Sequence, residues 1–538
     1  WMMMAPKTVK TSLRTHRVSN QVEPWHDVSL YTSDGLLRDW LRTSAAAGFE
    51  ADVVQFGEVL GQAQTWEWAR QANASKPELL AFDRSGHRLD EVRYHPAYHH
   101  LMRLACEAGV PSIAWRLPQG GHQAHAALEY MLCQVEAGVC CPVTMSYAAA
   151  SVLAKYPEFK ALHDKLLAPA YDASSQPLEA KMAATMGMAM TEKQGGSDLR
   201  AVTTTAQPIG GDAYELTGHK WFCSAPMSDA FLTLAQTPAG LTCFVLPRWR
   251  PDGRRNGLEF QRLKEKLGNH ANASSEVEFH GAWAQRIGEE GRGVATIIEM
   301  VHHTRLDCAV AAAGLMRQAL VQALHHATHR AAFGKRLIQQ PLMRRVLADL
   351  ALESEAATLL ALRAAELCDQ AETDPDCAPL ARLGVAVAKY WNNKRCPLHV
   401  AEAMECLGGA GYVEESLLPR LYREAPLNGI WEGSGNVICL DIMRTFAKEP
   451  ALPQLVVAEL GAAAKPVVAA FVAAEPGEAR QLAGRLARLW QRTLLGQRRR
   501  DGRAAIFEQA RAQAGAFGEF LPSDGVDALL DDALPVVL

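Results

Sequence analysis

Residues 421–436 read LYREAPLNGIWEGSGN and place the carboxyl of Glu432 between an aromatic residue and a run of small residues. A carboxylate on such a loop suits a catalytic base, because glycine lets other atoms approach the backbone closely. The alternative is that Glu432 caps a helix starting near Val437, with residues 433–435 as ordinary entry residues. This window alone favours the capping role, since short motifs are weak evidence. The choice between a catalytic base and a helix cap therefore depends on the rest of the sequence.

The composition describes a soluble globular protein of more than one domain, with 538 residues, 49% hydrophobic and 21% charged. A formal net charge of -4 and a pI near 6.6 give no general attraction to nucleic acid or to an anionic membrane. Such a partner would need a local basic patch. The longest apolar stretches fall short of the roughly 20 residues that a membrane-spanning helix needs, so no membrane segment is expected.

The twelve cysteines include no CxxC pair, and the chain shows no secretory leader, so we expect free, buried thiols in a reducing cytoplasm. The adjacent Cys140 and Cys141 are interpreted as core residues. His95, His99 and His100 lack the accompanying ligands of a metal site, and we predict no metal.

The periodicity changes twice along the chain. Apolar residues recur at helical spacing over about 33–181, alternate at strand spacing over about 186–290, and return to helical spacing over 293–447. A further helical segment follows. We therefore predict a mainly α member of the α+β class with four parts: 1–185, 186–290, 291–447 and 448–538.

Five windows, in order, resemble segments of the acyl-CoA dehydrogenase family. They are MTEKQGGSD (190–198), KWFCS (220–224), IGEEGRG (287–293), RAAFG (330–334), and ECLGGAGY (405–412) together with IWEGSGN (430–436). The resemblance implies the acyl-CoA dehydrogenase fold, with a helical N-terminal domain, a central β domain and a C-terminal helical bundle. It also implies FAD as the cofactor.

Two of these windows would hold the flavin. In the first, the glycines allow a tight turn that aims backbone amides and hydroxyls at polar cofactor atoms. In the second, the family places an aromatic beside the flavin and a hydroxyl two positions later. The resemblance therefore implies flavin contacts from Met190, Thr191, Gly196, Ser197, Phe222 and Ser224. Taken alone, each window would be an ordinary turn or an ordinary strand.

Two later windows would contact the remainder of the cofactor. Arg330 and Phe333 lie three residues apart at a predicted helix end, where a guanidinium can meet the pyrophosphate of FAD held by a neighbouring subunit. Gln340 is a candidate adenine contact, with a register uncertain by one residue. Gly408 and Gly409 leave bare backbone for a phosphate to approach.

The resemblance implies that Glu432 is the catalytic base of an acyl-CoA dehydrogenation. The base removes a proton from the carbon next to the thioester carbonyl, while a hydride leaves the following carbon for the flavin. The amide of Glu432 and a ribityl hydroxyl of FAD would hold the thioester oxygen. Burial would raise the pKa of the carboxyl. Gly433, Ser434 and Asn436 would then face the cofactor.

Within the family, the chain looks like the AidB branch, the bacterial adaptive-response flavoproteins, over about residues 22–445. Segments such as RYHPAYHHLM (93–102) and RLKEKLGNHANASSEVEF (262–279) carry this resemblance. It implies weak dehydrogenation of a branched acyl-CoA, a homotetramer, and double-stranded DNA binding through the C-terminal region.

The C-terminal region is basic: residues 480–511 hold nine arginines against Asp501 and Glu508, a net charge of +7. On one helix, a set of these arginines would form a basic stripe suited to phosphate contact without base readout. The alternative is a solvated helix, or one that pairs with the acidic segment 524–532. The predicted stripe comprises Arg485, Arg488, Arg492, Arg499 and Arg503.

Three functions are compatible with these residues. One is a DNA-associated flavoprotein of the alkylation-damage response that dehydrogenates a short or branched acyl-CoA. The second is a metabolic acyl-CoA dehydrogenase that passes electrons to an electron-transfer flavoprotein and has no DNA role. The third is an acyl-CoA oxidase that passes electrons to oxygen.

Overall fold

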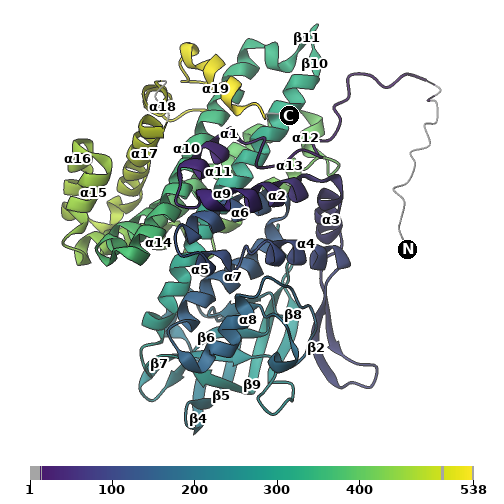
Figure 1. Cartoon of the computed structure of the whole chain (residues 1–538), viewed down its shortest axis with the longest axis vertical. Coiled ribbons are helices and arrows are strands. Elements are labelled where there is room, and N and C mark those ends of the chain that lie inside the picture. Colours follow the sequence, from purple (N-terminus) through teal and green to yellow (C-terminus); the bar gives the residue numbers. More distant parts are fainter. Residues whose placement is uncertain (1–12, 14, 499–501, 536–538) are drawn as a thin grey trace.

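The computed structural model describes residue 13, residues 15–498 and residues 502–535. A seven-stranded sheet forms one end of an elongated molecule, and long helices run from it to the other end (Figure 1). None of the helices within these described ranges is long and apolar enough to cross a membrane.

The N-terminal part is helical, as its periodicity predicts. Two of its helices, α6 and α7, are almost completely buried and meet at Glu136, whose side chain accepts from the N–H of Val139 and so caps α7. The part comprises α1 (Gly35–Thr43), α2 (Glu50–Gly61), α3 (Ala63–Ala74), α4 (Pro96–Glu107), α5 (Ile113–Arg116), α6 (Gly121–Val135), α7 (Ala137–Leu153) and α8 (Lys160–Leu166), with a hairpin of β1 (Glu78–Phe82) and β2 (Arg88–Arg93).

The central sheet follows the order β3-β6-β4-β5-β9-β7, with β8 paired to β9. Because β6 also pairs with β7, this path of strands closes on itself. The two longest strands, β5 and β9, lie side by side, and the window KWFCS forms the C-terminal end of β5. The strands are β3 (Met186–Ala189), β4 (Thr205–Gly210), β5 (Ala213–Ser224), β6 (Ala230–Thr237), β7 (Gly240–Pro247), β8 (Leu258–Leu263) and β9 (Ser274–Arg286).

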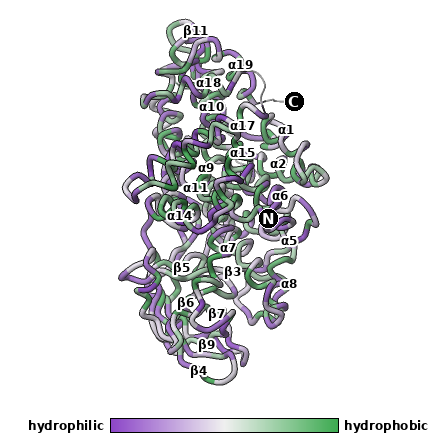
Figure 2. Tube along the Cα trace, turned by 90° about the vertical axis from the view of Figure 1, so that its left-hand side faces the viewer, coloured by the Kyte–Doolittle hydropathy of each residue, from purple (hydrophilic) through white to green (hydrophobic). Residues whose placement is uncertain are grey.

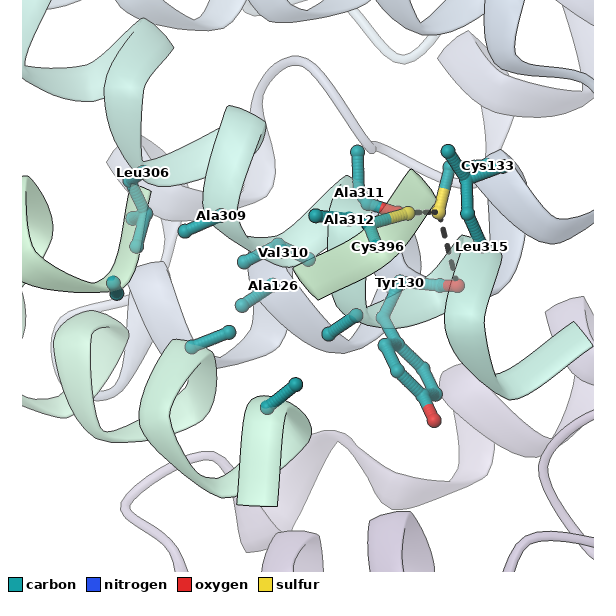
Figure 3. Packing of buried hydrophobic residues seen from close by; sticks show 14 of the residues in the cluster. Ala126, Tyr130, Cys133, Leu306, Ala309, Val310, Ala311, Ala312, Leu315 and Cys396 are labelled. Atoms are coloured by element: carbon teal, nitrogen blue, oxygen red, sulfur yellow. Dashed lines mark hydrogen bonds between the residues drawn. The ribbon is translucent and has the colours of Figure 1, made fainter. Parts of the chain in front are cut away.

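Three long helices, α9 (Gly293–His329), α10 (Pro341–Thr373) and α11 (Ala378–Cys406), form the second helical part. Small residues on α9 let α6 approach closely: a Cβ added at Gly314 would lie 2.4 Å from Cys133 Sγ. Figure 3 shows Cys133 and Tyr130 of α6 against this face of α9. Shorter elements complete the part: β10 (Ala331–Ala332), β11 (Lys335–Arg336), α12 (Gly409–Tyr412), α13 (Leu418–Glu424) and α14 (Gly435–Lys448).

The C-terminal segment packs on these helices and contains α15 (Leu452–Leu460), α16 (Lys465–Ala473), α17 (Ala479–Arg498), α18 (Arg503–Ala510) and α19 (Val526–Ala533). The predicted single basic helix is wrong. The helix α17 ends at Arg498, and Gly502 with φ +82° precedes the separate helix α18. Of the predicted arginine stripe, Arg499 lies outside the described residues.

Candidate active site

A cavity of about 650 Å³ lies where the sheet meets the helices, within the size range of small-molecule sites. Its walls come from α6, α7, the segment 188–199, the end of β5, residues 266–274, one face of α9, and the segment 423–444 that contains Glu432. Stretches that are far apart in the sequence therefore line one cavity together with the carboxyl that the sequence singles out.

The backbone at Glu432 is held in an uncommon conformation. Its φ is +59°, in the left-handed region that a residue other than glycine adopts rarely. Three successive carbonyl groups accept hydrogen bonds from buried cations: Lys389 Nζ donates to Trp431 O at 2.8 Å and to Gly433 O, and Arg305 Nε donates to Glu432 O at 3.0 Å. These bonds fix the loop, and burial lowers the pKa of Lys389.

The side chain of Glu432 is directed to α9, where Thr304 Oγ1 donates to its Oε2 at 2.7 Å. Burial raises the pKa of the Glu432 carboxyl above its ordinary value, although Thr304, Lys389 and Arg305 act in the opposite direction. The capping alternative is wrong, because the N-cap of α14 is Ser434 and the cap has no side-chain hydrogen bond. The carboxyl is free for chemistry on the cavity wall.

The loop at 190–198 is anchored by a buried ion pair that the sequence did not reveal. Glu192 accepts from Lys220 Nζ at 2.8 Å and from Thr204 Oγ1 at 2.6 Å, and both members of the pair are almost fully buried. Burial acts to raise the pKa of Glu192, but the bonds from Lys220 and Thr204 hold it well below its ordinary value. Because Lys220 begins the window KWFCS, this pair joins the two windows expected to hold the flavin.

Most of the predicted flavin residues line the cavity together. Gly196 packs so tightly that an added Cβ would lie 2.6 Å from Thr191 Oγ1, and the aromatic side chain of Phe222 is 49% exposed. Close-packed backbone, hydroxyls and an exposed aromatic fit a planar heterocycle such as a flavin. The predicted residues on the cavity are Met190, Thr191, Gly196, Ser197, Phe222, Ser224, Glu432, Gly433 and Ser434; Asn436 does not line it.

A second group of predicted cofactor residues does not reach this cavity. Arg330 and Phe333 lie at the far end of α9, which has 37 residues and is therefore about 55 Å long. Phe333 is 97% exposed at the tip of the β10–β11 hairpin, which Figures 1 and 2 show at the opposite end of the molecule from the sheet. Gln340 lies beside this hairpin and donates to Ala332 O at 3.1 Å. Gly408 and Gly409, at the end of α11, are also absent from the cavity wall.

The predicted DNA-binding arginines occupy different environments. Arg485 is exposed, Arg488 stacks 5.3 Å from the ring centre of Trp391, and Arg492 pairs with Glu508 at 3.2 Å. Arg503 is 2% exposed and forms ion pairs with Glu355 and Asp532. Contrary to the predicted stripe, Arg503 is thus a structural side chain rather than a surface cation.

Family comparisons agree with this arrangement. Residues 20–173 match the AidB N-terminal domain of the adaptive response protein, residues 187–282 the middle domain of acyl-CoA dehydrogenases, and residues 291–447 their C-terminal domain. The AidB protein of Escherichia coli (strain K12) is 47% identical over 441 residues, which cover 81% of each chain.

Solved structures give the same fold. The Caenorhabditis elegans protein ACDH-11 in complex with C11-CoA superposes with a TM-score of 0.82 and 27% identity, over 100% of this chain and 96% of that chain. An acyl-CoA dehydrogenase from Bacillus anthracis complexed with FAD has a TM-score of 0.66 and 16% identity, over 91% and 86% of the two chains.

The fold and the cavity define a flavin-dependent dehydrogenase of the acyl-CoA class. Specifically, the chain belongs to the acyl-CoA dehydrogenase family, in its AidB branch, and its cofactor is FAD. The expected fold, family and cofactor are thereby confirmed.

Proposed function

We propose that the chain dehydrogenates a short or branched acyl-CoA at its α and β carbons and that Glu432 is the base. The observation that carries the proposal is the position of this partly buried carboxyl on the wall of the same cavity as the Gly196 turn and the Phe222 ring. Bound FAD would supply a hydride acceptor.

The protein's own groups would prepare the proton transfer. Thr304 holds Oε2 of Glu432, so Oε1 is the oxygen placed to take the α proton. Glu432 precedes α14 and its N-cap Ser434, so the N–H of Glu432 takes no part in the hydrogen bonds of that helix, which suits the amide as a donor to the thioester oxygen. The raised pKa of the carboxyl brings a weak base closer to working pH.

The test is an anaerobic titration of the FAD-loaded protein with short, branched and long acyl-CoAs, followed by flavin bleaching. Glu432→Gln should retain FAD and abolish bleaching, because the amide keeps the shape but cannot take a proton. Bleaching of Glu432→Gln at the wild-type rate would remove Glu432 from the mechanism. Reoxidation by an electron-transfer flavoprotein, compared with oxygen, then separates a dehydrogenase from an oxidase.

The remote residues Arg330, Phe333, Gln340, Gly408 and Gly409 would contact FAD held by a neighbouring subunit of a homotetramer. The support is the length of α9, which separates the hairpin from the cavity of its own chain, and the nearly complete exposure of Phe333. Phe333→Ser should therefore weaken both assembly and FAD retention, as measured by analytical ultracentrifugation and flavin content.

A second role, sequence-independent binding of double-stranded DNA in the alkylation-damage response, is favoured by the exposed cations of α17. Arg485 is exposed and Arg488 half-buried, while apolar residues such as Leu486 pack inward. A cationic ridge of this kind neutralises phosphates without reading bases. Its test by charge removal is described in the Discussion.

A further inference from the structure

The buried end of the active-site cavity carries an acid that has no role in the proposed proton transfer. Glu129 of α6 lines the cavity and its side chain is fully buried, at 0% exposure. Neither carboxyl oxygen accepts a well-formed hydrogen bond from the described residues, and the neighbouring Cys140 thiol is only a weak donor. A buried polar group without partners is costly, so its presence on a cavity wall points to a ligand.

Asp307 of α9 lies at the same end of the cavity and is fully engaged. Its Oδ1 receives His125 Nε2 at 2.8 Å, and its Oδ2 accepts from Thr144 Oγ1 at 2.6 Å. The other ring nitrogen of His125 faces Val110 O at 2.7 Å. Because both partners of His125 are acceptors, both ring nitrogens donate, and the ring is cationic. Asp307 and His125 therefore neutralise one another.

Glu129 is left without a counter-charge of its own. Burial and the neighbouring Asp307 raise the pKa of Glu129, while His125 acts in the opposite direction. An uncharged carboxyl presents one hydroxyl donor and one carbonyl acceptor. The group that complements it is neutral and can both accept and donate a hydrogen bond.

The position of this acid along the cavity fixes where such a group would lie. Along α9 the cavity is lined by the exposed side chains of Val294 and Ile298 near the start of the helix and by the buried Leu315 further along it. Asp307 is three residues beyond Thr304 on α9, so their side chains are neighbours about 5–6 Å apart. Since Thr304 binds Glu432, Asp307, whose charge acts on Glu129, lies about one helical turn along α9 from the proposed site of proton removal.

We propose that the acyl chain carried by the substrate ends in, or bears near its end, a hydroxyl group that hydrogen-bonds to Glu129. The inference rests on the proposed function, because it takes the cavity as the acyl site. The apolar neighbours Cys140, Ala311 and Leu315 accommodate the alkyl part of the chain. A terminal carboxylate is disfavoured, because the neighbouring cation His125 is already neutralised by Asp307 and a second buried anion would lack a counter-charge.

Binding tests the proposal without relying on turnover. Calorimetry on FAD-loaded Glu432→Gln protein would compare ω-hydroxyacyl-CoAs with alkyl acyl-CoAs and ω-carboxyacyl-CoAs of equal length. We expect the hydroxyacyl compound of the matching length to bind at least about 10-fold more tightly than its alkyl counterpart. The carboxyacyl compound should bind most weakly.

Two substitutions of Glu129 assign the effect. Glu129→Leu should remove the preference for the hydroxyl and raise the melting temperature, since it replaces an unpartnered buried acid by an apolar group of similar size. Glu129→Gln should keep the preference, because an amide also donates and accepts. The contradicting result is an ω-aminoacyl-CoA that binds more tightly than the ω-hydroxyacyl-CoA, with this advantage removed in Glu129→Gln. This result would show that Glu129 is ionised and pairs with a cation, and it would overturn the assignment of an uncharged carboxyl.

The outcomes separate this inference from the proposed function. If alkyl acyl-CoAs bleach the wild-type flavin and bind at least as tightly as the hydroxyacyl series at every length, the inference fails and the proposed function stands. An unchanged preference in Glu129→Leu would also overturn the assignment to Glu129. If no acyl-CoA of any series binds, both fail.

Discussion

Lys389 Nζ donates to the carbonyl oxygen of Trp431 at 2.8 Å, so a buried cation on α11 holds the residue that precedes Glu432. Lys389 is 1% exposed, and its other recorded bond is to the carbonyl of Gly433 on the far side of Glu432. A cation with backbone partners on both sides of a residue constrains that residue's φ. The left-handed turn at Glu432 is therefore maintained by a side chain more than forty positions earlier in the sequence.

Replacing Lys389 by Met should misplace the Glu432 carboxyl without removing it. We expect the rate of flavin reduction by acyl-CoA to fall about 100-fold, because small displacements of a catalytic group have effects of this size. Lys394→Met is the matched control, since Lys394 lies near Gly435 but makes neither of these bonds. Stopped-flow reduction rates that are equal for the two variants would show that the Lys389 contacts do not position the base.

The pH dependence of flavin reduction should follow Glu432. Burial raises the pKa of Glu432 in the folded protein above the ordinary value of about 4.3. The carboxyl can act as a base only when it is ionised, so the rate of flavin reduction should rise as the pH increases through this raised pKa. The bond from Thr304 lowers the pKa, so Thr304→Val should move the profile to higher pH. A profile in Thr304→Val that is unmoved, or moved to lower pH, would contradict this assignment.

Two adjacent glycines provide a sharp test of the flavin loop. A Cβ at Gly196 would lie 2.6 Å from Thr191 Oγ1, whereas a Cβ at Gly195 would have its nearest neighbour, Asp198 O, at 3.9 Å. Gly196→Ala should therefore lower FAD occupancy strongly, and Gly195→Ala should leave it near the wild-type value. Absorbance of the released flavin gives the occupancy, and similar values for both variants would show that this turn does not cradle FAD.

The ion pair of Glu192 and Lys220 should matter for stability. Lys220→Met leaves a buried, uncompensated carboxylate, which costs about 3–5 kcal/mol in the free energy of unfolding. The double variant Glu192→Gln, Lys220→Met should recover part of this loss. Because the folded pKa of Glu192 is depressed, its contribution is present above the unfolded pKa and is lost as pH falls through the folded pKa. Chemical denaturation of the wild type, Lys220→Met and the double variant, at neutral and at acid pH, measures these free energies of unfolding. A double variant that is no more stable than Lys220→Met would show that the two side chains are not coupled.

Charge removal on α17 tests the DNA role. Replacing Arg485, Arg488 and Arg492 together by Gln should weaken binding to duplex DNA of any sequence and reduce the steepness of its salt dependence. Arg503→Gln is the control, since Arg503 is buried in ion pairs and should lower stability without changing the salt slope. If the triple variant and the wild type bind DNA with equal affinity and equal salt dependence, these three arginines are not the DNA-binding site.

Local sequence patterns predicted the fold and much of the candidate site. The alternation over residues 214–222 lies in β5, and Thr191, Phe222 and Glu432, which the windows assigned to one site, line one cavity. These features depend on periodicity and on short motifs, which a single sequence displays directly.

The features that were missed depend on contacts between distant positions. Lys389 and Glu129 sit on helices where an isolated charge has no distinguishing pattern. Only packing places Lys389 against the backbone of the Glu432 loop and Glu129 on the cavity wall. The predicted stripe placed Arg503 at the surface. Its ion pair with Asp532 agrees instead with the alternative of pairing with the acidic segment 524–532, whereas its other partner, Glu355, lies on α10 and had no signal in the sequence. The break between α17 and α18 was missed because Gly502 alone, within a run of arginines, is a weak signal.

The most direct test of the central claim is exchange of the substrate's α protons with D₂O, using an acyl-CoA whose β-carbon carries no hydrogen. Such a compound allows proton removal and blocks hydride loss, so mass spectrometry isolates the step assigned to Glu432. The FAD-loaded wild type should incorporate deuterium at least about 100-fold faster than Glu432→Gln. Equal incorporation by the two proteins would contradict the assignment of Glu432 as the base.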